Sequence, residues 1–110
     1  MEIIPAIIAK NFVELEQKVK LVEPYVDAVQ LDIMDGIFVP NATWPYFAGQ
    51  AITDLARLNT SLFLEAHLMT AEPESIMGAW LESKVGRIIV HWEAMAMNVI
   101  ARSEPRPSGV

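Results

Sequence analysis

The chain contains no cysteine, so it can build neither a disulfide framework nor a thiolate metal site. No apolar run approaches about 18 residues, and the opening residues MEIIPAIIAK lack the basic and long apolar segments of a secretory signal. Basic residues are few. The net charge of −6 and the pI of about 4.7 argue against nucleic acid or an anionic membrane as a partner. We expect a cytoplasmic protein.

Several sequence motifs are also missing. The sequence has no GxGxxG, Walker A, GxSxG or CxxC pattern, so dinucleotide-binding, P-loop and serine-hydrolase functions have no support. What is present is an ordinary globular composition of 53% hydrophobic and 20% charged residues. A chain of 110 residues is long enough for one small domain with a hydrophobic core.

Four strand-like segments alternate with helix-like segments along the chain. The predicted strands cover residues 3–9, 28–34, 61–69 and 87–92, and the first is apolar throughout. Strands that alternate with helices of 10–15 residues are typical of βαβ units. The sequence therefore predicts an α/β fold with a parallel sheet.

The predicted helices have recognisable ends. Asn11 is placed as an N-cap with Glu14 at the third helical position, and a stripe of apolar residues (Phe12, Leu15, Val19, Val22) follows before Pro24. After the loop GIFVPNATWP we expect a helix with one apolar side (Phe47, Ala51, Leu55, Leu58). Pro73 opens the next helix, and Gly86 is expected just after its end.

Polar residues recur on one face of the predicted strands. Alternation places Gln30, Asp32 and Met34 on one face of the second strand, Glu65, His67 and Met69 on one face of the third, and His91 and Glu93 on one face of the fourth. Ligands of parallel α/β folds bind outside the carboxyl ends of the strands. We therefore expect Asp32, His67 and His91 to converge there.

Taken one at a time, these residues have simpler roles. A lone inward histidine is more often a satisfied core or interface residue than a ligand. Asp32 must be paired, protonated or metal-bound, whereas Asp35 is expected to be a turn residue. Glu65 would find an arginine or lysine partner, and Met34 and Met69 would fill the core. Three polar groups at equivalent heights on consecutive strands nevertheless favour a functional site.

The segments IIPAIIAKNF, LDIMDGIFVPN, EAHLM and VHWEA, in this order and spacing, resemble the ribulose-phosphate 3-epimerase family from residue 3 to about residue 94. The resemblance implies a TIM barrel that interconverts ribulose 5-phosphate and xylulose 5-phosphate by moving a proton at C3. It also implies a divalent metal ion, zinc or similar, held by two histidines and two aspartates. One aspartate removes the proton and the other returns it to the opposite face.

The resemblance assigns roles position by position. Asp32 matches the first metal-binding acid/base, and His67 matches a histidine that binds the metal and borders the substrate. Met34 and Met69 match methionines that line the substrate site, and His91 matches a histidine at its border.

Two positions depart from the family pattern. Gln30 stands where the family has its first metal-binding histidine, and an amide oxygen is a weaker ligand for zinc-like ions than imidazole. Ala6 stands where the family has a serine that helps to hold the substrate, so this substrate-binding position loses its hydroxyl.

The resemblance divides the chain into two parts. Residues 1–94 correspond to the N-terminal half of a ribulose-phosphate-binding barrel, a partial (β/α)₈ fold of about four βα units, and 95–110 are expected to start a helix and continue as a disordered tail. A complete barrel typically needs about 200–250 residues. We therefore expect either a fragment of a longer product, inactive alone, or two copies paired as a homo-oligomer.

The favoured function is that of an epimerase-like sugar-phosphate isomerase. The alternative is a non-catalytic relative that binds a sugar phosphate or a partner chain. A decarboxylase or aldolase-like synthase of the same barrel class ranks lowest, because those enzymes use an aspartate and lysine network and the nearest lysine here, Lys10, lies just past the first strand.

Overall fold

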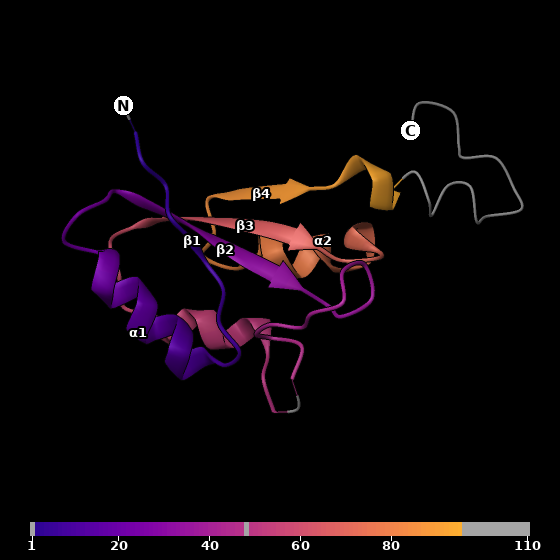
Figure 1. Ribbon diagram of the computed structural model, residues 1–110, viewed down its shortest axis with the longest axis horizontal. Helices are drawn as coiled ribbons and strands as arrows, with labels where there is room; N and C mark the ends of the chain where they lie inside the picture. Colours follow the sequence, from indigo (N-terminus) through magenta and orange to yellow (C-terminus); the bar gives the residue numbers. More distant parts are fainter. Residues whose placement is uncertain (1, 48, 96–110) are drawn as a thin grey trace, which may run out of the picture.

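The computed structural model describes residues 2–47 and 49–95, which form one sheet with helices between its strands (Figure 1). In chain order the elements are β1 (Ala6–Ile7), α1 (Phe12–Val22), β2 (Ala28–Met34), the 3₁₀ helix η1 (Ile52–Arg57), β3 (Phe63–Met69), α2 (Pro73–Leu81) and β4 (Arg87–Val90). The strands are parallel in the order β1-β2-β3-β4. This α/β arrangement confirms the predicted fold class, part of a TIM-barrel architecture.

The central strands lie close to where the sequence places them, but the outer strands are shorter. β2 has the predicted bounds, and β3 starts two residues late. β1 keeps two residues of the seven predicted because only Ala6 and Ile7 pair with β2, while Ile3 is 67% exposed. β4 ends at Val90, since the chain turns into a helical segment over 92–95. β1 and β4 are the sheet edges among the described residues, where ladders shorten readily.

Helix α1 begins as its sequence predicts. The Asn11 side chain accepts a hydrogen bond of 2.8 Å from the backbone nitrogen of Glu14, which satisfies one of the free N–H groups of the first turn. The apolar stripe buries Phe12, Leu15 and Val19 against the sheet. The predicted N-cap is confirmed.

The segment between β2 and β3 differs from its prediction. The expected amphipathic helix is a six-residue 3₁₀ helix, η1, which buries Leu55, and Leu58 is buried directly after it. Phe47 is 44% exposed and Ala51 is also exposed, so the predicted apolar side is wrong in its first half. The start of η1 is stabilised by a local hydrogen bond, in which the Asp54 carboxylate accepts from the Ala51 backbone nitrogen at 3.0 Å.

Gly86 also has a different role from the one predicted. α2 ends at Leu81, so Gly86 lies too far along the chain to follow its C-cap. A Cβ built on Gly86 would approach the Phe63 ring to 2.3 Å. Gly86 is therefore suited to close packing of the β3–β4 corner rather than to helix termination.

The hydrophobic core lies on one side of the sheet, between the strands and α1, η1 and α2. Strand residues such as Leu31, Ile33 and Leu68 are fully buried there. Trp80 of α2 has no exposed surface, and its ring meets Trp44 edge-on at a centroid distance of 6.0 Å. The opposite side of β2, β3 and β4 is left for polar groups.

Two predictions concern the remaining parts of the chain. The helix start and disordered tail expected over 95–110 fall, apart from Met95 at the end of the helical segment 92–95, outside the described residues. Within the ranges that the structure describes, no helix has the length and apolar character needed to cross a membrane.

Candidate functional site at the carboxyl ends of the strands

The two faces of β2 differ as alternation predicts. Val29, Leu31 and Ile33 are fully buried. Each is followed by a residue that is only partly buried and lies on the opposite, open face: Gln30, Asp32 and Met34. The sheet thus packs one face under its helices and presents the other as a polar surface.

Strand pairing brings the predicted site residues side by side. Asp32 is paired in register with His67, and Met34 with Met69. On the other side of β2, Ala6 is the register partner of Gln30. The carboxyl ends of β2, β3 and β4 point the same way (Figure 1), so these residues gather toward one edge of the open face.

Asp32 and His67 are joined by the amide of Gln30. The Gln30 Nε2 atom donates to Asp32 Oδ1 at 2.9 Å and lies 3.2 Å from His67 Nδ1. Asp32 Oδ1 and His67 Nδ1 are themselves 3.4 Å apart. The Asp32 side chain is 13% exposed and that of His67 22%. Asp32 is therefore paired, and it remains reachable from solvent.

His91 completes this cluster from the end of β4. Its Nε2 lies 2.9 Å from His67 Nε2, with the two rings stacked at a centroid distance of 4.9 Å. The Phe38 ring packs on His91 at 5.3 Å, and Glu93 lies 3.6 Å from His91 Nδ1. The predicted convergence of Asp32, His67 and His91 is thus present in the structure.

Phe38 and Thr43, in the loop after β2, contact the cluster or its strand and were not predicted as site residues from the sequence. The Thr43 Oγ1 atom accepts from the Met34 backbone nitrogen at 3.0 Å. Its one proton has two possible acceptors, the Trp44 backbone oxygen at 3.0 Å and the Asp32 backbone oxygen at 3.3 Å. Thr43 is 2% exposed. It fixes the carboxyl end of β2 at Met34, two residues after Asp32. A threonine in a loop flanked by Pro40 and Pro45 is the signal that could have identified it.

Asp35 does more than form a turn. Its Oδ1 accepts from the backbone nitrogens of Ile37 and Phe38, and its Oδ2 accepts from the Ala71 nitrogen at 2.9 Å. Partial burial opposes ionisation, but the bonds from Ala71, Phe38 and Ile37 outweigh it and hold the pKa of Asp35 below its usual value. Asp35 therefore ties the loop after β2 to the loop after β3.

Replacing Asp35 by asparagine should reduce the free energy of unfolding by about 1–2 kcal/mol near neutral pH, because a charged acceptor of three N–H groups is lost. The folded pKa is depressed, so this stabilisation is present above the unfolded pKa of about 3.9 and disappears as pH falls through the folded value. Urea unfolding of both forms from pH 7 to pH 3 measures it. The exposed Asp27→Asn variant is the control, and a wild-type advantage that grows toward pH 3 would contradict the prediction.

Glu65 forms an ion pair with a residue outside the Asp32–His67 cluster. Its carboxylate is 2.5 Å from Arg87 Nη1, and its side chain is only 4% exposed. The Arg87 guanidinium also lies over the Phe63 ring at 5.6 Å. The expectation of an arginine or lysine partner for Glu65 is confirmed, so Glu65 has a structural ion pair.

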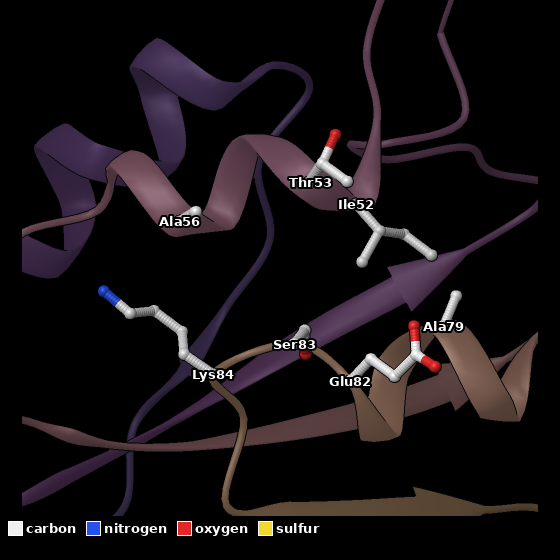
Figure 2. Close-up of a pocket in the computed structure, with 7 residues that line it drawn as sticks. All are labelled: Ile52, Thr53, Ala56, Ala79, Glu82, Ser83 and Lys84. Carbon is white, nitrogen blue, oxygen red and sulfur yellow. The ribbon is translucent and has the colours of Figure 1, made fainter.

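A separate groove of about 490 Å³ lies between η1 and α2 (Figure 2). Its lining comes from Ile52, Thr53, Ala56, Ala79, Glu82, Ser83 and Lys84. Lys84 Nζ donates to the Leu58 backbone oxygen at 2.5 Å, which ties the end of α2 to η1. The helices that form this groove cover the packed face of the sheet, so it is distinct from the Asp32–His67 cluster.

The donor set can be tested against the divalent metal ion that the resemblance implies. Two ligands about 2.1 Å from a tetrahedral ion are about 3.4 Å apart, and Asp32 Oδ1 and His67 Nδ1 have this separation. Gln30 meets both residues through its Nε2 atom, which cannot ligate a cation, so its amide would have to turn over to offer the oxygen as a weaker ligand. Within residues 2–47 and 49–95, no group of three or more His, Asp or Glu side chains could hold a metal ion. Asp32 and His67 therefore fit two positions of such a site.

The fold and this cluster define a class, α/β proteins with a polar site at the carboxyl ends of parallel strands. A family model described as the ribulose-phosphate 3 epimerase family matches residues 2–106. The chain belongs to this family.

Three curated relatives show how much of the chain is matched. A chloroplastic ribulose-5-phosphate-3-epimerase of Arabidopsis thaliana is 38% identical over 90 residues, 81% of this chain and 31% of the relative. The ribulose-phosphate 3-epimerase of Bacillus subtilis is 35% identical over 95 residues, 86% of this chain and 42% of the relative. That of Chlamydia pneumoniae is 41% identical over 75 residues, 68% and 31% respectively. These alignments thus cover less than half of each relative's length.

Proposed function

We propose that this chain supplies the N-terminal half of the active site of a ribulose-phosphate 3-epimerase, which interconverts ribulose 5-phosphate and xylulose 5-phosphate at C3. The observation that carries the proposal is the Asp32–Gln30–His67 cluster on the open sheet face, with His91 beside it. Family membership supports the reaction class. The partial coverage of the relatives supports the assignment to one half of the site.

Asp32 is the residue proposed to move the proton. Removing a proton next to a carbonyl needs a carboxylate within hydrogen-bond reach of that carbon. Asp32 projects from the middle of a rigid strand, and the Gln30 amide orients its Oδ1. Met34 and Met69, paired in register on the same face, would form an apolar wall against which the substrate lies.

Asp32 and His67 would hold the divalent ion, and the other ligands would come from outside the described residues. Gln30 would be a weaker third donor only with its amide turned so that the oxygen, in place of Nε2, faces the pair. When bound, such an ion stabilises the negative charge that develops on the substrate oxygens. His67 would orient the substrate at the same time, and His91 would border it. Ala6, next to Gln30 in register, would leave its side of the site without a hydroxyl contact.

Inversion at C3 requires a second acid on the opposite face of the substrate. Among the described residues, Glu65 is paired with Arg87 and Asp35 is held by three backbone N–H groups. We assign the second acid and the phosphate-binding groups to the half of the barrel that this chain does not match in its relatives. The chain alone is therefore expected to produce no xylulose 5-phosphate.

A chimera tests the proposal. Residues 1–95 of this chain replace the aligned N-terminal part of the Bacillus subtilis relative, and the product is assayed with ribulose 5-phosphate in the presence of Mn²⁺ or Zn²⁺. We expect xylulose 5-phosphate formation above that of the relative's C-terminal part alone. A folded chimera that binds the ion but does not turn over substrate would contradict the proposal.

One observation favours a second candidate, a non-catalytic relative that binds a sugar phosphate or a partner chain. The Gln30 amide already donates to Asp32 and lies 3.2 Å from His67 Nδ1, so both side chains have a polar neighbour without an ion. In that case the chimera would bind ribulose 5-phosphate in calorimetry without converting it. The cytoplasmic location and a homo-oligomer remain predictions from the sequence.

A further inference from the structure

His91 lies just beyond the part of β4 that the sheet holds. The ladder between β3 and β4 ends at the pair Leu68 and Val90, and β4 itself ends at Val90. The backbone oxygen of His91 accepts a hydrogen bond of 3.1 Å from the Ala94 nitrogen, at the start of the helical segment 92–95. Strand pairing therefore does not set the direction of the His91 side chain, and the contacts of its ring must do so.

The His91 ring has polar and apolar neighbours. Its Nε2 lies 2.9 Å from His67 Nε2, and its Nδ1 lies 3.6 Å from the Glu93 carboxylate. The side chains of His67, His91 and Glu93 are 22%, 31% and 52% exposed, so water can replace either polar partner. The apolar neighbour is the Phe38 ring, at a centroid distance of 5.3 Å. Water is a poor substitute for an apolar ring, so Phe38 is the neighbour that fixes the His91 ring.

Phe38 is itself held by the loop that carries it. Its backbone nitrogen donates to Asp35 Oδ1 at 3.0 Å, in a turn where Gly36 has a φ of 81° that glycine adopts without strain. Asp35 Oδ2 accepts from the Ala71 nitrogen at 2.9 Å and so anchors this turn to the loop after β3. The Phe38 ring therefore reaches from an anchored loop after β2, past β3, to the residue that follows β4.

We propose that Phe38 is a positioning residue for His91, whose ring it holds against His67 at the carboxyl ends of β3 and β4. The planes of the two imidazoles are 19° from parallel, and their centroids are 4.9 Å apart. The two rings then form one wall of the open face. That a substrate meets this wall rests on the proposed function. That Phe38 holds the wall together does not, because it follows from the contacts of the His91 ring.

The test is proton NMR of the full chain, which has two histidines and four phenylalanines. Nuclear Overhauser cross-peaks are recorded with a metal chelator at about pH 8, above the ordinary histidine pKa of about 6.5. In the parent we expect cross-peaks from the His91 ring to the rings of Phe38 and His67. Phe38→Ala removes the apolar contact and should weaken the His91–His67 cross-peaks. Phe38→Tyr keeps the ring and should retain them.

The chimera gives a second readout. Phe38→Ala should raise the KM for ribulose 5-phosphate by about 2–10-fold with little change in kcat, because the contact at stake is one neutral hydrogen bond from His91 to the substrate. An unchanged KM would contradict the assignment of this wall to the substrate. Phe47→Ala is the matched control, since Phe47 is 44% exposed, and it should change neither the cross-peaks nor the two kinetic constants.

Unchanged His91–His67 cross-peaks in folded Phe38→Ala would overturn the inference, and so would a parent without cross-peaks between Phe38 and His91. If Phe38→Ala does not fold, Phe38→Leu removes the ring but keeps more of the apolar volume, and the same expectation applies to it. A chimera without turnover contradicts the proposed function but leaves the cross-peaks of the chain unaffected. Cross-peaks that persist without the Phe38 ring contradict this inference even if the chimera is active.

Discussion

Replacing Asp32 by asparagine should lower the epimerase rate of the chimera by about 10²–10⁴-fold, the usual contribution of a positioned general base. Asparagine keeps the size of the side chain and an oxygen that can accept from Gln30 Nε2, so the strand and the amide contact should persist. The group that takes the proton from C3 is lost. The measurement is the turnover of ribulose 5-phosphate at saturating substrate.

A matched control separates the chemistry from general effects of charge. Asp27→Asn removes the same charge at an exposed position just before β2 and should leave the turnover unchanged. Unfolding curves of the two variants should nearly coincide with that of the parent. If Asp32→Asn retains more than about a tenth of the parent turnover, Asp32 is not the proton-moving group.

The largest expected effect on stability comes from Trp80. Replacement by alanine should reduce the free energy of unfolding by about 3–5 kcal/mol, because the side chain is fully buried and its removal leaves a cavity against Trp44. A loss of this size is a large fraction of the stability of a small domain. Urea unfolding followed by circular dichroism measures it.

Trp92 provides the matched control for this substitution. It is 73% exposed, and Trp92→Ala should change the free energy of unfolding by less than about 0.5 kcal/mol. Equal effects of the two tryptophan replacements would contradict the burial of Trp80 in the core between α2 and the sheet.

The face of each residue was predictable for most of β2 because its alternation is uninterrupted from Val29 to Met34. A strand of seven residues with buried aliphatics at every second position can be placed in only one way without exposing Leu31 and Ile33. The co-location of Asp32 and His67 followed from this alternation together with the parallel sheet.

The loop after β2 was not predictable in the same way. Its shape depends on contacts whose partners are backbone groups, such as the bond between Asp35 and the Ala71 nitrogen, and every residue except proline offers such a nitrogen. The start of η1 was not predictable either. The Asp54 carboxylate accepts from the Ala51 backbone nitrogen and from the Trp44 ring nitrogen, and the first of these bonds caps η1 at Ala51, so Phe47 stays outside the helix.

The atomic contacts within the cluster could not be predicted from the sequence either. Alternation places Gln30, Asp32 and His67 on one face, but it does not say which atom of the amide meets which partner. That depends on the side-chain torsions and on the one-to-one register of β2 with β3. The sequence marked Gln30 as a departure from the family, and the structure shows how its amide meets its two neighbours.

The separation of the two faces of β2 has a consequence for how this protein can change. Because the aliphatic side chains that hold the fold and the polar ones that meet a ligand point in opposite directions, substitutions on one side leave the other largely undisturbed. Variation at positions 6 and 30 can therefore accumulate without loss of the folded state. The same sheet could serve as a scaffold on which a new specificity is selected, with Leu31, Ile33 and Leu68 left untouched.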